Sequence, residues 1–106
     1  MKSINYNGAI YVNGDREGLL LLGLSEGEAD TVMLAFAKAD AEQFRDELLR
    51  VAAIRIAPLQ DAVDLGKATD AEVALLKAWK EYRIDVGRIA EQVGYPSNII
   101  WPEQPA

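Results

Sequence analysis

The chain has 106 residues, a net charge of −6 and a hydrophobic content of 50%, which suits one small domain. Cysteine and histidine are both absent. Their absence excludes disulfides, thiolate nucleophiles and the usual zinc ligands, and it removes the side chain most often used for proton transfer near neutral pH. We therefore expect no catalysis, no cofactor and no metal site.

The negative charge is concentrated in one part of the chain. Residues 15–47 contain nine acids and three bases, whereas the remainder contains eight of each. An acidic surface disfavours nucleic acid, because phosphate binding needs clustered Lys and Arg. We interpret the acidic stretch as a solvated helix surface, with a docking surface for a basic partner as the alternative.

No apolar run is long enough to cross a bilayer; the four consecutive leucines at residues 19–22 are far too short. The first residues, Met1-Lys2-Ser3, do not resemble a signal peptide. We therefore expect no membrane partner and a cytoplasmic location.

The first forty residues show β patterns and then a helix start. Alternating apolar residues flank Asn7-Gly8, which predicts a short β-hairpin. Asn13-Gly14 predicts a polar turn that runs to Gly18, and residues 19–22 read as a further strand. Residues 25–28 (SEGE) form a capping box, which predicts a helix over residues 26–37.

A long apolar stripe follows. Asp40 can cap a new helix, and one continuous helix is the alternative because no strong breaker intervenes. The apolar positions then alternate at spacings of three and four, which is typical of a helix packed on another helix: Leu49, Ala52, Ile56, Leu59 and Val63. Pro58 lies inside this stripe without changing its phase. It predicts a kink in a single helix rather than two helices.

A second helix is predicted after a tight turn. Gly66 is a natural C-terminal cap, and residues 69–72 (TDAE) form a second capping box. The second helix should run from Asp70 to Val93, since its apolar positions again alternate at four and three: Leu75, Trp79, Tyr82, Val86, Ile89 and Val93. Two such helices joined by a tight turn should form an antiparallel hairpin.

The last twelve residues should be extended, because prolines at 96, 102 and 105 prevent a helix. Ile99, Ile100 and Trp101 are bulky and apolar, so the tail should either fold back along the hairpin or bind a partner as an added strand or in a groove. We expect a mainly α (α+β) fold, one compact domain overall. Its parts are a small N-terminal β/α segment (residues 1–39), the helical hairpin (40–94) and the extended tail (95–106).

The candidate partner-binding residues are aromatic, apolar or cationic side chains of the second helix and the tail: Trp79, Tyr82, Arg83, Tyr95, Ile99, Ile100, Trp101 and Pro102. Trp79 and Tyr82 can instead pack inside the hairpin, and Arg83 can be an ordinary surface arginine. Neighbouring acids such as Asp61 and Asp64 read as surface charges rather than as a catalytic pair.

Several segments of the second half resemble the C-terminal region of bacteriophage tail fibre assembly proteins. The resemblance begins at about Asp40 and is most specific at residues 56–66 (IAPLQDAVDLG), 68–70 (ATD), 78–83 (AWKEYR) and 100–102 (IWP). Family members commonly have a larger β-rich N-terminal domain. Here only residues 24–28 (LSEGE) followed by Leu34 are similar in character.

The resemblance implies a phage or prophage chaperone that binds the distal C-terminal part of a tail fibre and assists its folding and trimerisation. It implies action in the host bacterial cytoplasm, with retention on the fibre as a further option. Self-association of the chain also stays open. Two other functions remain as alternatives: an adhesin-like fibre-tip protein kept on the particle, and a generic homodimeric helical adaptor.

Overall fold

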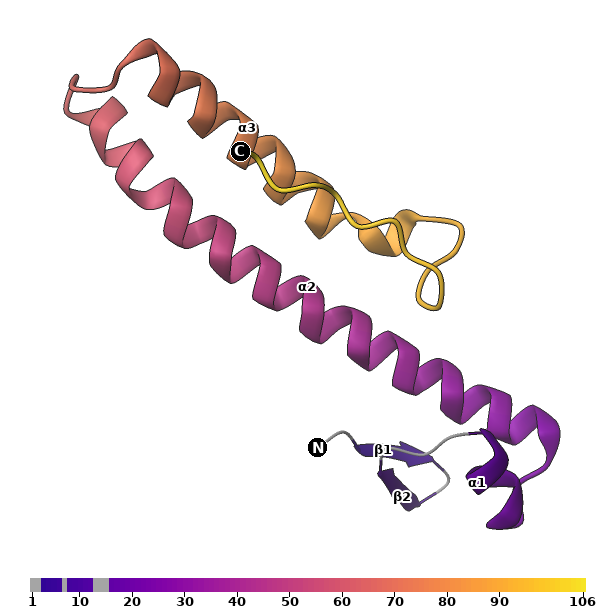
Figure 1. Ribbon diagram of the computed structural model, residues 1–106. Helices are drawn as coiled ribbons and strands as arrows, with labels where there is room; N and C mark the ends of the chain where they lie inside the picture. The colour runs from indigo at the N-terminus through magenta and orange to yellow at the C-terminus, as the bar shows by residue number, and fades with distance from the viewer. Residues whose placement is uncertain (1–2, 7, 13–15) are drawn as a thin grey trace. The chain divides into compact units, whose positions relative to one another are not determined.

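The computed structural model describes residues 3–6, 8–12 and 16–106, and they form two compact units that meet within one helix. The first unit comprises residues 1–42 and the second residues 43–106. The described residues form, in chain order, two strands, three α-helices and one short 3-10 helix. The expected fold class, mainly α with a small β part, is confirmed (Figure 1). None of the described helices is long and apolar enough to cross a membrane.

The predicted β-hairpin is present at the start of the first unit. Strands β1 (Ser3–Tyr6) and β2 (Ala9–Val12) pair antiparallel, and Tyr6 lies opposite Ala9. Gly8 has a φ of +81°, the left-handed conformation that a tight hairpin turn requires. Asn7, which the prediction also placed in this turn, lies outside the described residues, as do Asn13 and Gly14 of the second predicted turn.

The segment expected to be a third strand is a helix. Helix α1 (Arg16–Leu21) contains most of residues 19–22. Its Leu19 is 1% exposed and belongs to a core cluster with Ala29, Val32 and Phe36. A run of four apolar residues is too short for periodicity to separate strand from helix. Burial of Leu19 in this cluster accompanies the helical form.

Helix α1 is terminated by a glycine, Gly23, which in the sequence was a sign of a helix rather than a strand at residues 19–22. Gly23 has a φ of +96°, the Gly23 amide bonds the Leu20 carbonyl, and the Leu24 amide bonds the Leu19 carbonyl. These two bonds form a Schellman motif, which ends helices and does not end strands.

Helix α2 (Glu26–Asp64) is one unbroken helix, so the continuous alternative is correct and Asp40 begins no new helix. Its start is the predicted capping box: the Glu28 amide bonds the Ser25 hydroxyl, and the Ser25 amide bonds the Glu28 carboxylate. The helix continues through Pro58, as the constant phase of the stripe indicated. A kink at Pro58 stays a prediction.

In the second unit, α2 turns and returns as α3 (Asp70–Gly87), which forms the predicted antiparallel hairpin (Figure 1). The buried residues shared by the two helices are Ala52, Ile56, Leu76, Trp79, Tyr82 and Val86. Ala52 of α2 is fully buried in the same cluster as Trp79 and Tyr82 of α3, so the seam combines a small residue with bulky aromatic ones.

The hairpin turn has the predicted caps at both ends. Gly66 has a φ of +68°, and the Lys67 amide bonds the Ala62 carbonyl at 2.8 Å in a second Schellman motif. Thr69 caps α3: its hydroxyl accepts from the Glu72 amide at 3.1 Å, and its own amide donates to the Glu72 carboxylate at 2.9 Å. Both orphan amides are therefore satisfied.

The second helix is shorter than predicted. It ends at Gly87 instead of Val93 and is followed by a 3-10 turn, η1 (Ile89–Glu91). Glycine is a poor helix former, and the tighter turn still keeps Ile89 at 1% exposure. The apolar spacing that suggested a longer helix is thus preserved at Ile89 but not at Val93, which is fully exposed.

Removing the Thr69 cap should destabilise the second unit. We expect Thr69→Ala to lower the free energy of unfolding by about 1 kcal/mol, because the Glu72 amide loses its acceptor, the Thr69 hydroxyl. Urea unfolding followed by circular dichroism measures the change. Thr31→Ala is the matched control, since that hydroxyl bonds the Gly27 carbonyl within a helix and caps nothing. Equal effects of the two substitutions would contradict the capping role.

Candidate partner-binding surface

The chain reverses direction after η1 through two successive turns. The Tyr95 amide bonds the Gln92 carbonyl at 3.1 Å, and the Asn98 amide bonds the Gly94 carbonyl at 2.7 Å. A Cβ atom at position 94 would collide with the Asn98 carbonyl, so only glycine permits this approach. The Tyr95–Pro96 peptide bond is cis. The reversal sends the tail, residues 95–106, back along α3 (Figure 1).

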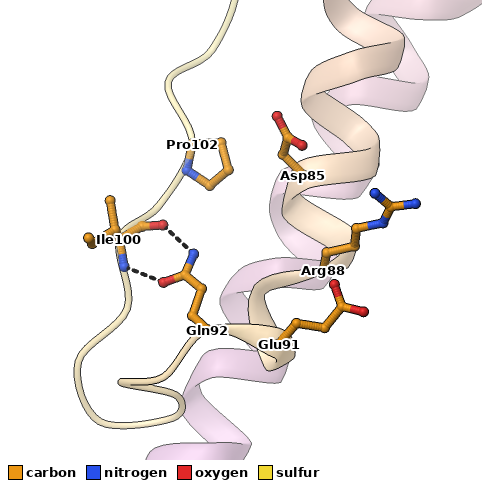
Figure 2. Close-up of a pocket in the computed structure, with 6 residues that line it drawn as sticks. All are labelled: Asp85, Arg88, Glu91, Gln92, Ile100 and Pro102. Atoms are coloured by element: carbon orange, nitrogen blue, oxygen red, sulfur yellow. Dashed lines mark hydrogen bonds between the residues drawn. The ribbon is translucent and has the colours of Figure 1, made fainter.

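One side chain holds the backbone of the tail. The Gln92 side-chain amide donates to the Ile100 carbonyl at 2.7 Å, and its Oε1 atom accepts from the Ile100 amide at 2.9 Å (Figure 2). We call this pair of bonds the Gln92 clasp. Both backbone groups of Ile100 must face the same way to reach one side chain, which is the geometry of an extended residue.

Two aromatic rings anchor the next residue of the tail. Trp101 packs edge-to-face on Phe44 of α2, with ring centroids 4.7 Å apart and planes at 86°. Trp101 is half-buried, while Phe44 remains 47% exposed. Pro102 and Pro105 border a hollow over α3 together with Tyr82. The tail therefore covers part of the hairpin, as the fold-back alternative proposed.

The surface around the Gln92 clasp carries both negative and positive charges. An open hollow of about 460 Å³ is lined by Asp85, Arg88, Glu91, Gln92, Ile100 and Pro102 (Figure 2). Carboxylates and a guanidinium lie together there, so the hollow does not select ligands of one charge. Among the described residues, no group of three acids could hold a metal ion.

The predicted site residues fall into three groups. Trp79 and Tyr82 are 6% and 4% exposed and contact each other edge-to-face at 5.5 Å, so they lie in the hairpin core. Arg83 is an exposed residue of α3. The tail residues Tyr95, Ile99, Trp101 and Pro102 are half-buried, whereas Ile100 is 82% exposed. The tail residues thus lie on the surface of the hairpin, whereas Trp79 and Tyr82 lie inside it.

Sequence reasoning missed Gln92 and Phe44, the two residues that position the tail. Gln92 lies eight residues before its partner, in a segment predicted to be helical, and no motif links the two. Phe44 had a signal, because it is an aromatic residue outside the apolar stripe of α2. Such a residue is available for a contact from elsewhere in the chain, and Trp101 packs on it.

Some acids of the acidic stretch form ion pairs on the solvated surface. Arg16 bonds Asp30 at 2.7 Å within the first unit, and Arg50 bonds Glu47 within the second. The hydrogen bond from Arg50 lowers the pKa of Glu47. These exposed pairs agree with the helix-surface interpretation of the negative charge.

The Tyr82 hydroxyl is buried and has no hydrogen-bond partner among the described residues. A buried hydroxyl that loses its hydrogen bonds to water costs free energy, so the ring and not the hydroxyl should stabilise this position. We expect Tyr82→Phe to leave the melting temperature unchanged or to raise it. Tyr82→Ala should lower it, because the ring fills the core. A marked drop for the phenylalanine variant would show that the hydroxyl has a partner.

Comparison with known proteins gives consistent matches. A sequence model described as the Caudovirales tail fibre assembly protein, lambda gpK, matches residues 27–106. The tail fiber assembly protein of Escherichia phage lambda is 43% identical over 70 residues, which are 66% of this chain and 35% of the lambda protein. Protein TfaD of Escherichia coli K12 is 44% identical over 70 residues, which are 66% of this chain and 36% of that protein.

A third relative has the same character. The probable tail fiber assembly protein of Shigella phage SfV is 44% identical over 64 residues, which are 60% of this chain and 35% of that protein. The chain spans about a third of the length of the curated relatives that it matches. No solved structure matches it.

Proposed function

The chain belongs to the Caudovirales tail fibre assembly protein family, and we propose that it assists the assembly of a phage tail fibre. More narrowly, we propose that it binds the C-terminal part of the fibre and promotes its folding and trimerisation. The observation that carries the proposal is the match of the family over residues 27–106, which contain nearly all of α2, all of α3 and the tail.

The physical properties of the chain suit a binding role. Large apolar residues of the second unit stay in contact with water, among them Ile54, Ile84, Val93 and Ile100. The tail adds an extended backbone held at a defined place on α3. Exposed apolar side chains and extended backbone are the features by which proteins recognise other chains.

A β-rich trimeric fibre is prone to aggregation while it assembles, and a bound protein can prevent this. Pairing between distant segments and between chains is slow, and unpaired edges that are exposed meanwhile lead to aggregation. A small acidic protein bound at the fibre end would cover apolar surface and keep the complex soluble. This activity belongs to the host bacterial cytoplasm, before the particle is complete.

Co-expression tests the proposal. We expect the cognate tail fibre protein to give more soluble, SDS-resistant trimer when the two are produced together. Leu76→Asp is the control, because it puts a charge into the buried hairpin seam and should abolish the effect. Equal trimer yields with the unaltered chain, the variant and no added chain would refute the assembly role.

A further inference from the structure

The Gln92 clasp fixes the orientation of the neighbouring peptide groups as well as that of Ile100. In a trans peptide unit the carbonyl and the amide point in opposite directions. Because the Ile100 amide and carbonyl both face Gln92, the Ile99 carbonyl and the Trp101 amide must face away from it. Neither group forms a hydrogen bond with any residue in the described part of the chain.

Pro102 leaves this outer edge intact. A residue before proline prefers an extended conformation, so Trp101 should direct its carbonyl to the same side as its amide. The ring nitrogen of Pro102 then lies on the side that faces Gln92, where its missing N–H removes no donor from the outer edge. The outer edge therefore offers three backbone groups for hydrogen bonding. They are the Ile99 carbonyl as an acceptor, the Trp101 amide as a donor and the Trp101 carbonyl as a second acceptor.

The side chains alternate in the same way. Trp101 is half-buried and packs on Phe44, whereas Ile100 is 82% exposed on the opposite face of the extended backbone. The tail thus has one edge occupied by Gln92, one face anchored on α2, one free edge and one free apolar side chain. This is the arrangement of an edge strand that can accept a further strand.

We propose that this tail edge, residues 99–101, binds a β-strand of the tail fibre by strand addition. A strand satisfies the carbonyl of Ile99 and the amide of Trp101 together, and it can place an apolar side chain against Ile100. The Gln92 clasp orders the edge in advance, so that less backbone entropy is lost on binding. The proposal rests on the proposed function, because it takes the fibre as the partner.

The test measures the affinity of the chain for a recombinant trimeric C-terminal fragment of its cognate tail fibre. Gln92→Glu keeps the acceptor but replaces the donor to Ile100 with a carboxylate oxygen. We expect it to weaken binding about tenfold or more, because the tail must then be ordered during association. Gln104→Glu, the same charge change at an exposed tail position, should alter affinity by about twofold at most.

A second pair of variants tests the free side chain. Ile100→Asp should weaken binding while leaving the melting temperature unchanged, since the residue is mainly in contact with water. Ala53→Asp introduces the same charge at an exposed α2 position of the second unit and is the control, which should bind normally. Hydrogen exchange supplies an independent measurement: the Trp101 amide should become protected in the complex.

The outcomes separate this proposal from the assembly role. If the unaltered chain does not bind the fibre fragment, both proposals fail. If it binds, but Gln92→Glu and Gln104→Glu bind equally well, the tail edge is not the contact and the assembly role survives. Tighter binding by Gln92→Glu would show that the tail competes with the fibre, and it would also overturn the strand-addition proposal.

Discussion

The apolar seam between α2 and α3 is the contact on which the rest of the second unit depends. An 18-residue helix has little stability alone in water, so α3 exists because Trp79, Tyr82 and Val86 pack against α2. The tail packs on Phe44 of α2 and borders Tyr82 of α3, while Gln92, which follows α3, bonds its backbone. Loss of the seam would therefore also release the tail.

The first unit faces a different constraint, which is its size. Two strands of four residues cannot be stable alone. Ile4, Tyr6 and Tyr11 of the sheet pack against a cluster built around Leu19 and the first turns of α2. The helical conformation of α1 matters here, because Leu19 is the α1 residue buried in that cluster. The strand prediction for residues 19–22 could not see this requirement, since it arises from packing and not from local pattern.

The features that could be predicted from sequence are those that depend on neighbouring residues. The capping boxes at Ser25 and Thr69 and the glycine at 66 each involve a few consecutive positions, and all three appear as expected. The hairpin followed from apolar spacing, a longer local pattern. The end of α3 was harder, because a 3-10 turn keeps Ile89 buried with nearly the same spacing as a helix. The Gln92 clasp joins a side chain to a backbone across a turn and leaves no trace in residue pattern.

The tail also shows why two interpretations that looked opposed are compatible. One treated residues 99–101 as a cover for the hairpin, and the other treated them as a recognition segment. In an extended chain successive side chains point to opposite faces, so one stretch can do both. Trp101 turns toward Phe44 and covers the hairpin, while the adjacent Ile100 turns to water. The contact that covers the hairpin also fixes the backbone of the tail, and a binding edge with a fixed backbone loses less entropy when a partner binds.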